Sequence, residues 1–260
     1  MPRAIASPRA PRYDSALALR ELAAADPKLG RLIQRAGPFT LRVSGGQSPF
    51  EALVESIVYQ QLHGKAAATI HRRLLESFGP TLAPNQVADI LPIGTKAHRE
   101  AVENGAKHPT PQQILDCPNE QLRAAGLSAN KALALRDLAA KTLDGTVPTL
   151  AQIRRMSDDA VIEHLTQVRG IGVWTVHMML IFRLGRPDVL PTGDYGVRKG
   201  FALTFGKLKP FADGKPVKVT PGDLATPAEM EKRARKWHPW CSVASWYLWR
   251  ACDLAAGKLP

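Results

Sequence analysis

Apolar residues recur along most of the chain three or four positions apart, the spacing of one helix face. The first such run, from Leu17 to Leu22, is separated by Asp26-Pro27 from a second run that includes Leu29 and Ile33. Asp14 precedes the first run as a good N-cap, and Asp26-Pro27 begins the second helix. Because the frequent Ala, Leu, Arg and Glu residues also favour helix, the chain is predicted to be all-α.

Prolines, glycines and serines divide the rest of the pattern into further short helices. A long helix is predicted from about Pro49, with a break at Gln60 to Gly64 and a continuation to Phe78. The other helices are predicted at 111–116, 118–125, 130–144, 150–156, 158–168, 173–184, 194–205 and 227–256. Two irregular insertions are expected at 92–109 and 207–226.

Charge and cysteine content narrow the class of protein. The 35 Lys and Arg residues exceed the 23 Asp and Glu residues, and the net charge of +12 favours either a protein that meets phosphate backbones or a merely basic one. Cys117, Cys241 and Cys252 are too few and too far apart for a disulfide framework or a four-cysteine zinc or iron–sulfur site. With no long apolar segment and no signal peptide, we expect a cytoplasmic protein without membrane contact.

A Gly-x-Gly hairpin lies between two of the predicted helices, in the segment Leu-Thr-Gln-Val-Arg-Gly-Ile-Gly-Val-Trp-Thr that ends at Thr175. Gly170 and Gly172 are able to adopt positive φ, and Ile171 between them is expected to hold the turn in the core. The next helix begins with free N–H groups and the positive end of its dipole, which suit a phosphate. The alternative is a tight turn between helices, because Gly-x-Gly alone is weak evidence.

The hairpin resembles the helix-hairpin-helix motif of the base-excision DNA glycosylase superfamily, and a Pro-x-Gly-Asp-Tyr segment ending at Tyr195 follows at that superfamily's distance. The resemblance is closest to the DNA-3-methyladenine glycosylase II family and covers most of 26–250. It implies a compact helix-hairpin-helix glycosylase fold of two helical subdomains with the active cleft between them. Cys241 departs from this family's arginine, and Met178 stands where some relatives have an aromatic residue.

On this basis three parts of the chain are distinguished. Residues 1–12 are expected to be a disordered basic tail. Residues 13–48 plus 195–260 are assigned to a terminal helical subdomain, and 49–194 to a helical barrel that contains the helix-hairpin-helix motif at 165–184.

Asp194 is the candidate catalytic residue because the resemblance places it at the family's catalytic aspartate. Cleavage of an N-glycosidic bond develops positive charge on the deoxyribose, which a buried carboxylate stabilises. The alternative role is a simple helix N-cap, worth about 1 kcal/mol. Relatives that also cut the DNA backbone have a lysine in the hairpin where this chain has Trp174, so water is the expected nucleophile and lyase activity is not expected.

The substrate pocket is expected to be aromatic. An alkylated purine carries positive charge, which makes it a good leaving group and an attractive partner for tryptophan. The resemblance assigns the pocket to Trp174, Trp249 and Met178. The other tryptophans of the C-terminal segment are expected in the core.

The DNA contacts are predicted at the hairpin and at the break in the helix near Gln60. Gly170, Gly172 and Thr175 are expected to bind a phosphate through backbone amides. Leu62 or Gln61 would fill the space left by an extruded base, unless the break is only a packed kink. The family implies a monovalent cation held by carbonyl groups of the hairpin, which in this chain are those of Thr166, Val168 and Ile171.

The sequence thus predicts a monofunctional glycosylase that removes alkylated purines, of the 3-methyladenine and 7-methylguanine type, from double-stranded DNA. It is expected to bind DNA without sequence specificity, to act as a monomer, and to need no cofactor beyond the hairpin cation. Two alternatives stay open: a glycosylase of the same fold for oxidised or mismatched bases, and a non-catalytic helix-hairpin-helix DNA-binding protein.

Overall fold

The computed structural model describes residues 9–44, 47–79, 108–208 and 219–258. Every element of regular secondary structure in these ranges is a helix, which confirms the all-α prediction. Most of the expected basic tail, most of the 92–109 insertion and half of the 207–226 insertion lie outside the described residues. None of the described helices is long and apolar enough to cross a membrane.

The helices begin where the sequence supplies caps. The Asp14 side chain accepts hydrogen bonds from the first amides of α1 (Ser15–Ala25), and Asp26 does the same for α2 (Pro27–Ala36). Gly37 ends α2 with a φ of 80°, which a residue with a side chain rarely adopts. Ser48 and Glu51 form a capping box at the start of α3 (Pro49–Tyr59). These local interactions fix the boundaries that the sequence predicted.

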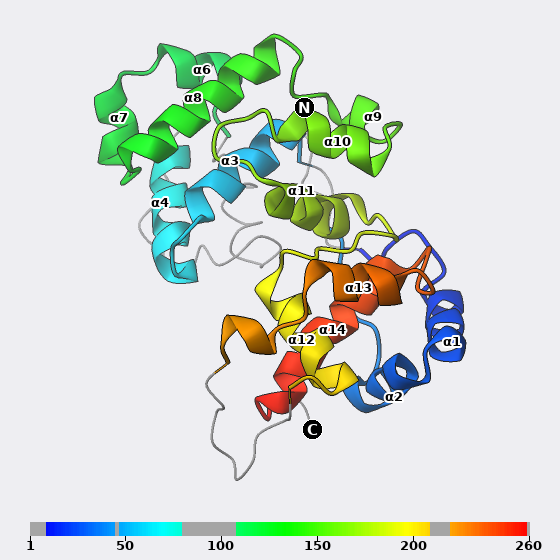
Figure 1. The fold of residues 1–260 in the computed structure, drawn as a ribbon. Helices are drawn as coiled ribbons and strands as arrows, with labels where there is room; N and C mark the ends of the chain where they lie inside the picture. The colour runs from blue at the N-terminus through cyan, green and yellow to red at the C-terminus, as the bar shows by residue number, and fades with distance from the viewer. Residues whose placement is uncertain (1–8, 45–46, 80–107, 209–218, 259–260) are drawn as a thin grey trace. The chain divides into compact units, whose positions relative to one another are not determined.

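The chain divides into two compact units, and the first contains Ser44–Met179. Its helices after α3 are α4 (Gly64–Glu76), α6 (Pro111–Asp116), α7 (Asn119–Ala124), α8 (Ala129–Leu143), α9 (Leu150–Ile153), α10 (Asp158–Leu165) and α11 (Val173–Met179). The long helix α8 packs against α3, α6 and α7 (Figure 1). Leu53 and Ile57 of α3 and Leu135 and Leu138 of α8 are completely buried and form the centre of this core.

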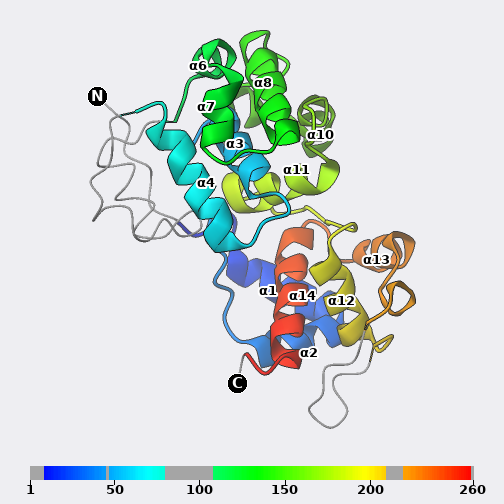
Figure 2. The ribbon, with the colours of Figure 1, turned by 90° about the vertical axis from the view of Figure 1, so that its left-hand side faces the viewer.

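The second unit combines Ala10–Val43 with Leu180–Pro260. After α1 and α2 it contains η2 (Leu180–Leu184), α12 (Tyr195–Phe205), η3 (Pro221–Asp223), α13 (Pro227–Ala234) and α14 (Cys241–Ala255). Helix α14 packs along α12 and against α2 (Figure 2). A Cβ atom at Gly200 would lie 1.8 Å from the Leu248 carbonyl oxygen, so α12 and α14 approach each other at a point where only glycine fits.

A buried carboxylate joins α2 to α13 within the second unit. Asp26 is fully buried and accepts two hydrogen bonds of 2.7 Å from the Arg233 guanidinium. The Trp237 indole donates at 3.1 Å, and the Lys236 ammonium lies 3.2 Å away. Burial alone would raise the pKa of Asp26, but these donors together lower it to about 2.

Two boundaries differ from the predictions. The predicted helix at 227–256 is two helices, because Pro239 has no backbone N–H to donate and restricts His238 before it. The predicted helix at 173–184 is α-helical only to Met179 and continues as the π-helical η2. The units meet in the sequence between Val43 and Ser44 and between Met179 and Leu180, whereas the predicted boundaries follow residues 48 and 194. Asp194 therefore belongs to the second unit and not to the predicted barrel.

Candidate active site and hairpin

The hairpin between α10 and α11 is held in the core of the first unit by apolar side chains. Val168 and Ile171 are 1% and 4% exposed. Gly170 has a φ of 78°, whereas Gly172 has no positive φ, so the sequence-based expectation holds for one of the two glycines. A Cβ atom at Gly172 would meet nothing within 4 Å inside the protein. Its exposed position is therefore open to a partner from outside.

The backbone amides of Gly170 and Gly172 have no hydrogen-bond acceptor within the described part of the chain, and both residues are exposed. The Thr175 amide differs, because it donates to the Gly172 carbonyl at 3.0 Å, and the Thr175 side chain is buried. Of the three predicted phosphate ligands, the two glycines thus offer amides to a ligand, and Thr175 stabilises the first turn of α11.

Three polar residues from other helices hold the hairpin, and none of them is among the predicted site residues. The Gln60 side chain donates to the Gly170 carbonyl at 2.8 Å. Asp137 of α8 accepts from the Arg169 amide at 2.7 Å and pairs with Lys141 at 2.8 Å. Burial acts to raise the pKa of Asp137, but these two donors lower it overall. The hairpin backbone is consequently fixed before any ligand arrives.

The turn between α3 and α4 contains the two candidate wedge residues. Gln61 has a φ of 57°, which is uncommon for a residue with a side chain, and Leu62 is an exposed apolar residue at 38%. The Lys131 ammonium donates to the carbonyls of Val58 at 2.6 Å and Gln60 at 2.9 Å, at the end of α3. Gln60 therefore connects this turn to the hairpin, since its side chain binds Gly170.

The carbonyls of Thr166, Val168 and Ile171 are the predicted ligands of a monovalent cation. They follow the C-terminal end of α10, where the helix dipole favours positive charge. The neighbouring Gln167 carbonyl already accepts a hydrogen bond from the Lys141 ammonium. The Val168 carbonyl accepts the Ile171 amide at 3.0 Å and keeps a second lone pair.

In the second unit, Asp194 is the N-cap of α12 and is 9% exposed. Its Oδ1 atom accepts a hydrogen bond of 2.8 Å from the Val197 amide, as a capping residue does. The same atom accepts a second bond of 2.8 Å from the indole N–H of Trp249 on α14. The Trp249 ring packs against Phe182, with 5.5 Å between ring centroids. The carboxylate is thus oriented by two helices, which capping alone does not require.

Gly196 makes this arrangement possible. A Cβ atom at this position would lie 2.7 Å from Trp249 Cδ1 and 3.2 Å from Asp194 Oδ1. Any larger residue would therefore displace the indole or the carboxylate. No local pattern in the sequence marks Gly196 as a site residue, because the clash comes from Trp249 on α14.

The predicted site residues fall into one group in each unit. Trp174 and Met178 lie four residues apart on α11, and so on one helix face, with Trp174 half exposed. Asp194 and Trp249 are in direct contact in the second unit. Trp237 and Trp246 are buried, as expected for core residues.

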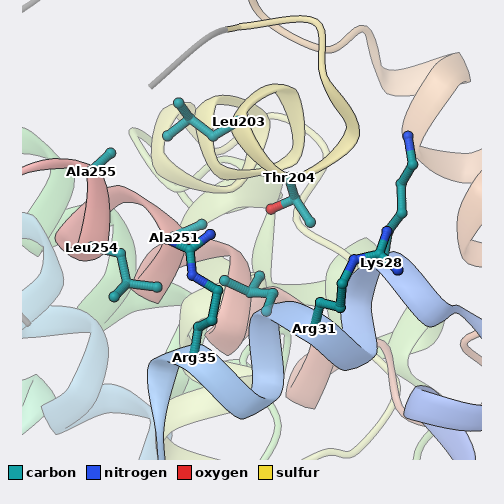
Figure 3. A pocket seen from close by; sticks show the side chains of 9 residues that line it. Lys28, Arg31, Arg35, Leu203, Thr204, Ala251, Leu254 and Ala255 are labelled. Atoms are coloured by element: carbon teal, nitrogen blue, oxygen red, sulfur yellow. The ribbon is translucent and has the colours of Figure 1, made fainter. Parts of the chain in front are cut away.

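A separate hollow of about 230 Å³ lies in the second unit (Figure 3). It is lined by Lys28, Arg31, Leu32, Arg35, Leu203, Thr204, Ala251, Leu254 and Ala255. Thr204 is at the C-terminal end of α12, and Asp194 is at its other end, about 15 Å away at 1.5 Å per residue. This hollow is therefore not the pocket in which Asp194 would act.

The model of the HhH-GPD superfamily of base excision DNA repair proteins matches residues 54–210, which is more than half of the chain. The chain belongs to this superfamily. Within it, the chain is 31% identical over 240 residues to DNA-3-methyladenine glycosylase 1 of Schizosaccharomyces pombe, covering 92% of this chain and 88% of the relative. The family and the helix-hairpin-helix glycosylase fold that the sequence predicted are confirmed.

Two solved structures of the superfamily agree with this assignment. The Schizosaccharomyces pombe 3-methyladenine DNA glycosylase in complex with abasic DNA has a TM-score of 0.66 at 31% identity, over 90% of this chain and 95% of that one. The DNA-3-methyladenine glycosidase of Bacillus halodurans has a TM-score of 0.70 at 28% identity, over 94% and 93%.

Proposed function

We propose that this HhH-GPD protein is a monofunctional DNA glycosylase that hydrolyses the N-glycosidic bond of alkylated purines in double-stranded DNA, as a step of base excision repair. Relatives named as 3-methyladenine DNA glycosylases, at up to 31% identity, support the substrate class. The observation that carries the chemistry is the carboxylate of Asp194, held at Oδ1 by the Val197 amide and the Trp249 indole.

Asp194 stabilises the transition state by its charge. Departure of the base leaves positive charge at C1′ of the deoxyribose, and a fixed carboxylate beside it lowers the barrier without reorganising. The same carboxylate orients the attacking water. A base alkylated at N3 or N7 is already cationic, so it departs without a protein general acid.

The nucleophile is water because the hairpin lacks the lysine of the lyases. Trp174 occupies that position by resemblance to the family, and an indole forms no Schiff base. Its half-exposed ring offers instead a surface on which an electron-poor base stacks, with Met178 on the same face of α11. In the second unit, Trp249 beside Asp194 is the aromatic residue proposed to bind the base.

DNA is bound through its backbone, and so without sequence specificity. The protein acts as a monomer. The exposed amides of Gly170 and Gly172 receive a phosphate, and a monovalent cation on the hairpin carbonyls adds positive charge there. Leu62, the exposed apolar residue of the α3–α4 turn, fills the gap left by the extruded base, with Gln61 as the alternative. The excess of 35 basic over 23 acidic residues adds attraction that weakens with salt.

The test replaces Asp194 with Asn, which preserves the shape and the N-cap but removes the charge. Release of 3-methyladenine from methylated duplex DNA is expected to fall by about 10²–10³-fold in single turnover, with binding to abasic DNA retained. The matched control is Asp14→Asn, another capping aspartate of the same unit, which should leave the rate unchanged. Near wild-type release by Asp194→Asn would exclude this mechanism.

The two alternatives are separated by the same protein and a panel of damaged duplexes. Activity confined to 8-oxoguanine or to a mismatch would assign the chain to a different glycosylase specificity. Binding to every duplex with no base release would make it a non-catalytic DNA-binding protein. The contact between Asp194 and Trp249 favours catalysis, because a module that only binds DNA has no need for an indole to orient a capping carboxylate.

A further inference from the structure

Three side chains that commonly bind metals meet in the second unit, away from the residues assigned above. Asp188 lies in the segment between η2 and α12, His238 lies before α14, and Cys241 is the first residue of α14. Their ligand atoms all lie within 4.8 Å of one another. His238 Nδ1 is 2.7 Å from Asp188 Oδ2 and 3.7 Å from Cys241 Sγ.

A simple ion pair explains only part of this cluster. Asp188 Oδ1 accepts the Cys241 amide at 3.2 Å, which caps α14, and Asp188 Oδ2 pairs with His238. The Cys241 thiol, however, approaches the same nitrogen that already bonds to Asp188. The thiol is also within hydrogen-bond reach of the Asp188 carboxylate, so a nitrogen, an oxygen and a sulfur lie close enough together to share one cation in place of these protons. A Cys-His-Asp relay is excluded because it would place the thiol and the carboxylate on opposite ring nitrogens.

The backbone around the cluster is already fixed. The Ser242 hydroxyl donates to the Arg186 carbonyl at 2.7 Å and accepts the Val189 amide at 2.9 Å. The Ser242 amide donates to the Pro187 carbonyl at 2.9 Å. These bonds hold the segment with Asp188 against the first turn of α14, so little order has to be created when an ion binds.

We propose that Asp188, His238 and Cys241 bind a Zn²⁺ ion. A nitrogen, an oxygen and a thiolate sulfur form a ligand set that zinc prefers. Around a tetrahedral zinc, typical bond lengths put a nitrogen and a sulfur ligand about 3.5 Å apart, close to the 3.7 Å between His238 and Cys241. The ion replaces the thiol proton, which leaves to solvent, and separates Asp188 from His238. Cys241 is buried and His238 is exposed, so water occupies the fourth position from the solvent side.

Bound zinc would link the segment that leads to Asp194 with α14, the helix that carries Trp249. Asp194 and Trp249, which contact each other directly, would then also be connected through the zinc ion. The ion stabilises the folded protein and takes no part in base release.

The experiment adds Zn²⁺ or Co²⁺ to the full-length protein after treatment with a chelator. We expect one equivalent of Zn²⁺ by elemental analysis, a higher midpoint of thermal unfolding, and a thiolate-to-cobalt charge-transfer band with Co²⁺. Cys241→Ser and Asp188→Asn should lose stoichiometric binding, and Cys241→Ser should lose the band. Cys117→Ser, a buried cysteine of the first unit, is the matched control and should retain both.

A second readout needs no substitution, and so does not depend on a variant that folds. Zn²⁺ should protect Cys241 of the wild-type protein from alkylation during partial unfolding, as measured by mass spectrometry, and leave Cys117 unprotected. Equal protection of both cysteines, no stoichiometric zinc in the wild type, or an unchanged cobalt band in Cys241→Ser would each overturn the proposal. Because these readouts involve no DNA, their outcome does not depend on the proposed glycosylase activity.

Discussion

Substitution of Gly196 by alanine tests whether the Trp249 indole positions the Asp194 carboxylate. The added Cβ atom would lie 2.7 Å from Trp249 Cδ1 and 3.0 Å from its Nε1 atom. The indole is a rigid ring packed against Phe182, so it cannot yield by moving a flexible end. It has to swing away from α12, and the 2.8 Å bond from Trp249 Nε1 to Asp194 Oδ1 is then lost.

The size of the effect follows from the bond that is lost. A hydrogen bond to a charged group contributes about 1.5–3 kcal/mol, and the contact is made where the carboxylate has to be oriented. At about 1.4 kcal/mol for each factor of ten, base release should slow by about tenfold to a hundredfold. Overpacking adds a cost of about 1–3 kcal/mol to the free energy of unfolding, which is measured separately by denaturant titration.

The assay is single-turnover release of 7-methylguanine from methylated duplex DNA, with saturating protein. Gly222→Ala is the control, because a Cβ atom there would meet only the Thr220 hydroxyl at 3.8 Å. Trp249→Phe removes the indole N–H and completes a double-mutant cycle with Gly196→Ala. Trp249 does not position Asp194 if Gly196→Ala releases base within about twofold of wild type, or if the substitution slows the Trp249→Phe protein as much as it slows the wild type.

Three further outcomes are expected. Leu62→Ala should slow excision from duplex DNA more than Gln61→Ala in the same assay, and the reverse order would assign the wedge to Gln61. Asp137→Asn should weaken binding to abasic duplex DNA several-fold with an unchanged circular dichroism spectrum, because it loosens the Arg169 amide, and unchanged affinity would contradict this. Since the pKa of Asp26 is lowered from 3.8 to about 2, its stabilisation is complete above pH 4 and is lost as the pH falls toward 2. The free energy of unfolding from urea titrations should fall by about 2 kcal/mol over this pH range, and the fall should be absent from Asp26→Asn. Equal acid sensitivity of the two proteins would show that ionised Asp26 does not stabilise the fold.

Helix boundaries were predictable where a local residue determines them. Asp14 and Asp26 cap their helices through their own side chains, so one short segment contains the whole signal. The break before α14 was missed for the opposite reason. Trp237 and Trp240 continue the helical spacing through the turn, because both pack on the second unit, and only Pro239 marks the break.

The sequence allowed candidate site residues to be selected, but not the contacts that hold them in place. Asp194 and Trp249 were selected because each occupies a position of the family's motifs, yet nothing in the sequence states that they bond to each other across 55 positions. The bond between Gln60 and the hairpin spans 110 positions. Gly196 could not be selected for the same reason, because the clash that forbids a side chain there comes from α14. Contacts between distant segments leave no periodic pattern in a single sequence.

The proposed wedge and the proposed phosphate site share one support within the first unit. Gln60 binds the Gly170 carbonyl with its side chain and is held at its own carbonyl by Lys131. The adjacent Gln61 adopts a φ of 57°, a conformation that costs about 1 kcal/mol or more and persists only where its surroundings enforce it. Because the same residue fixes both segments, a phosphate at the proposed hairpin site would be held at a fixed distance from the proposed wedge residue, Leu62. The spacing between the proposed phosphate site and the proposed wedge is thereby set by contacts within the first unit.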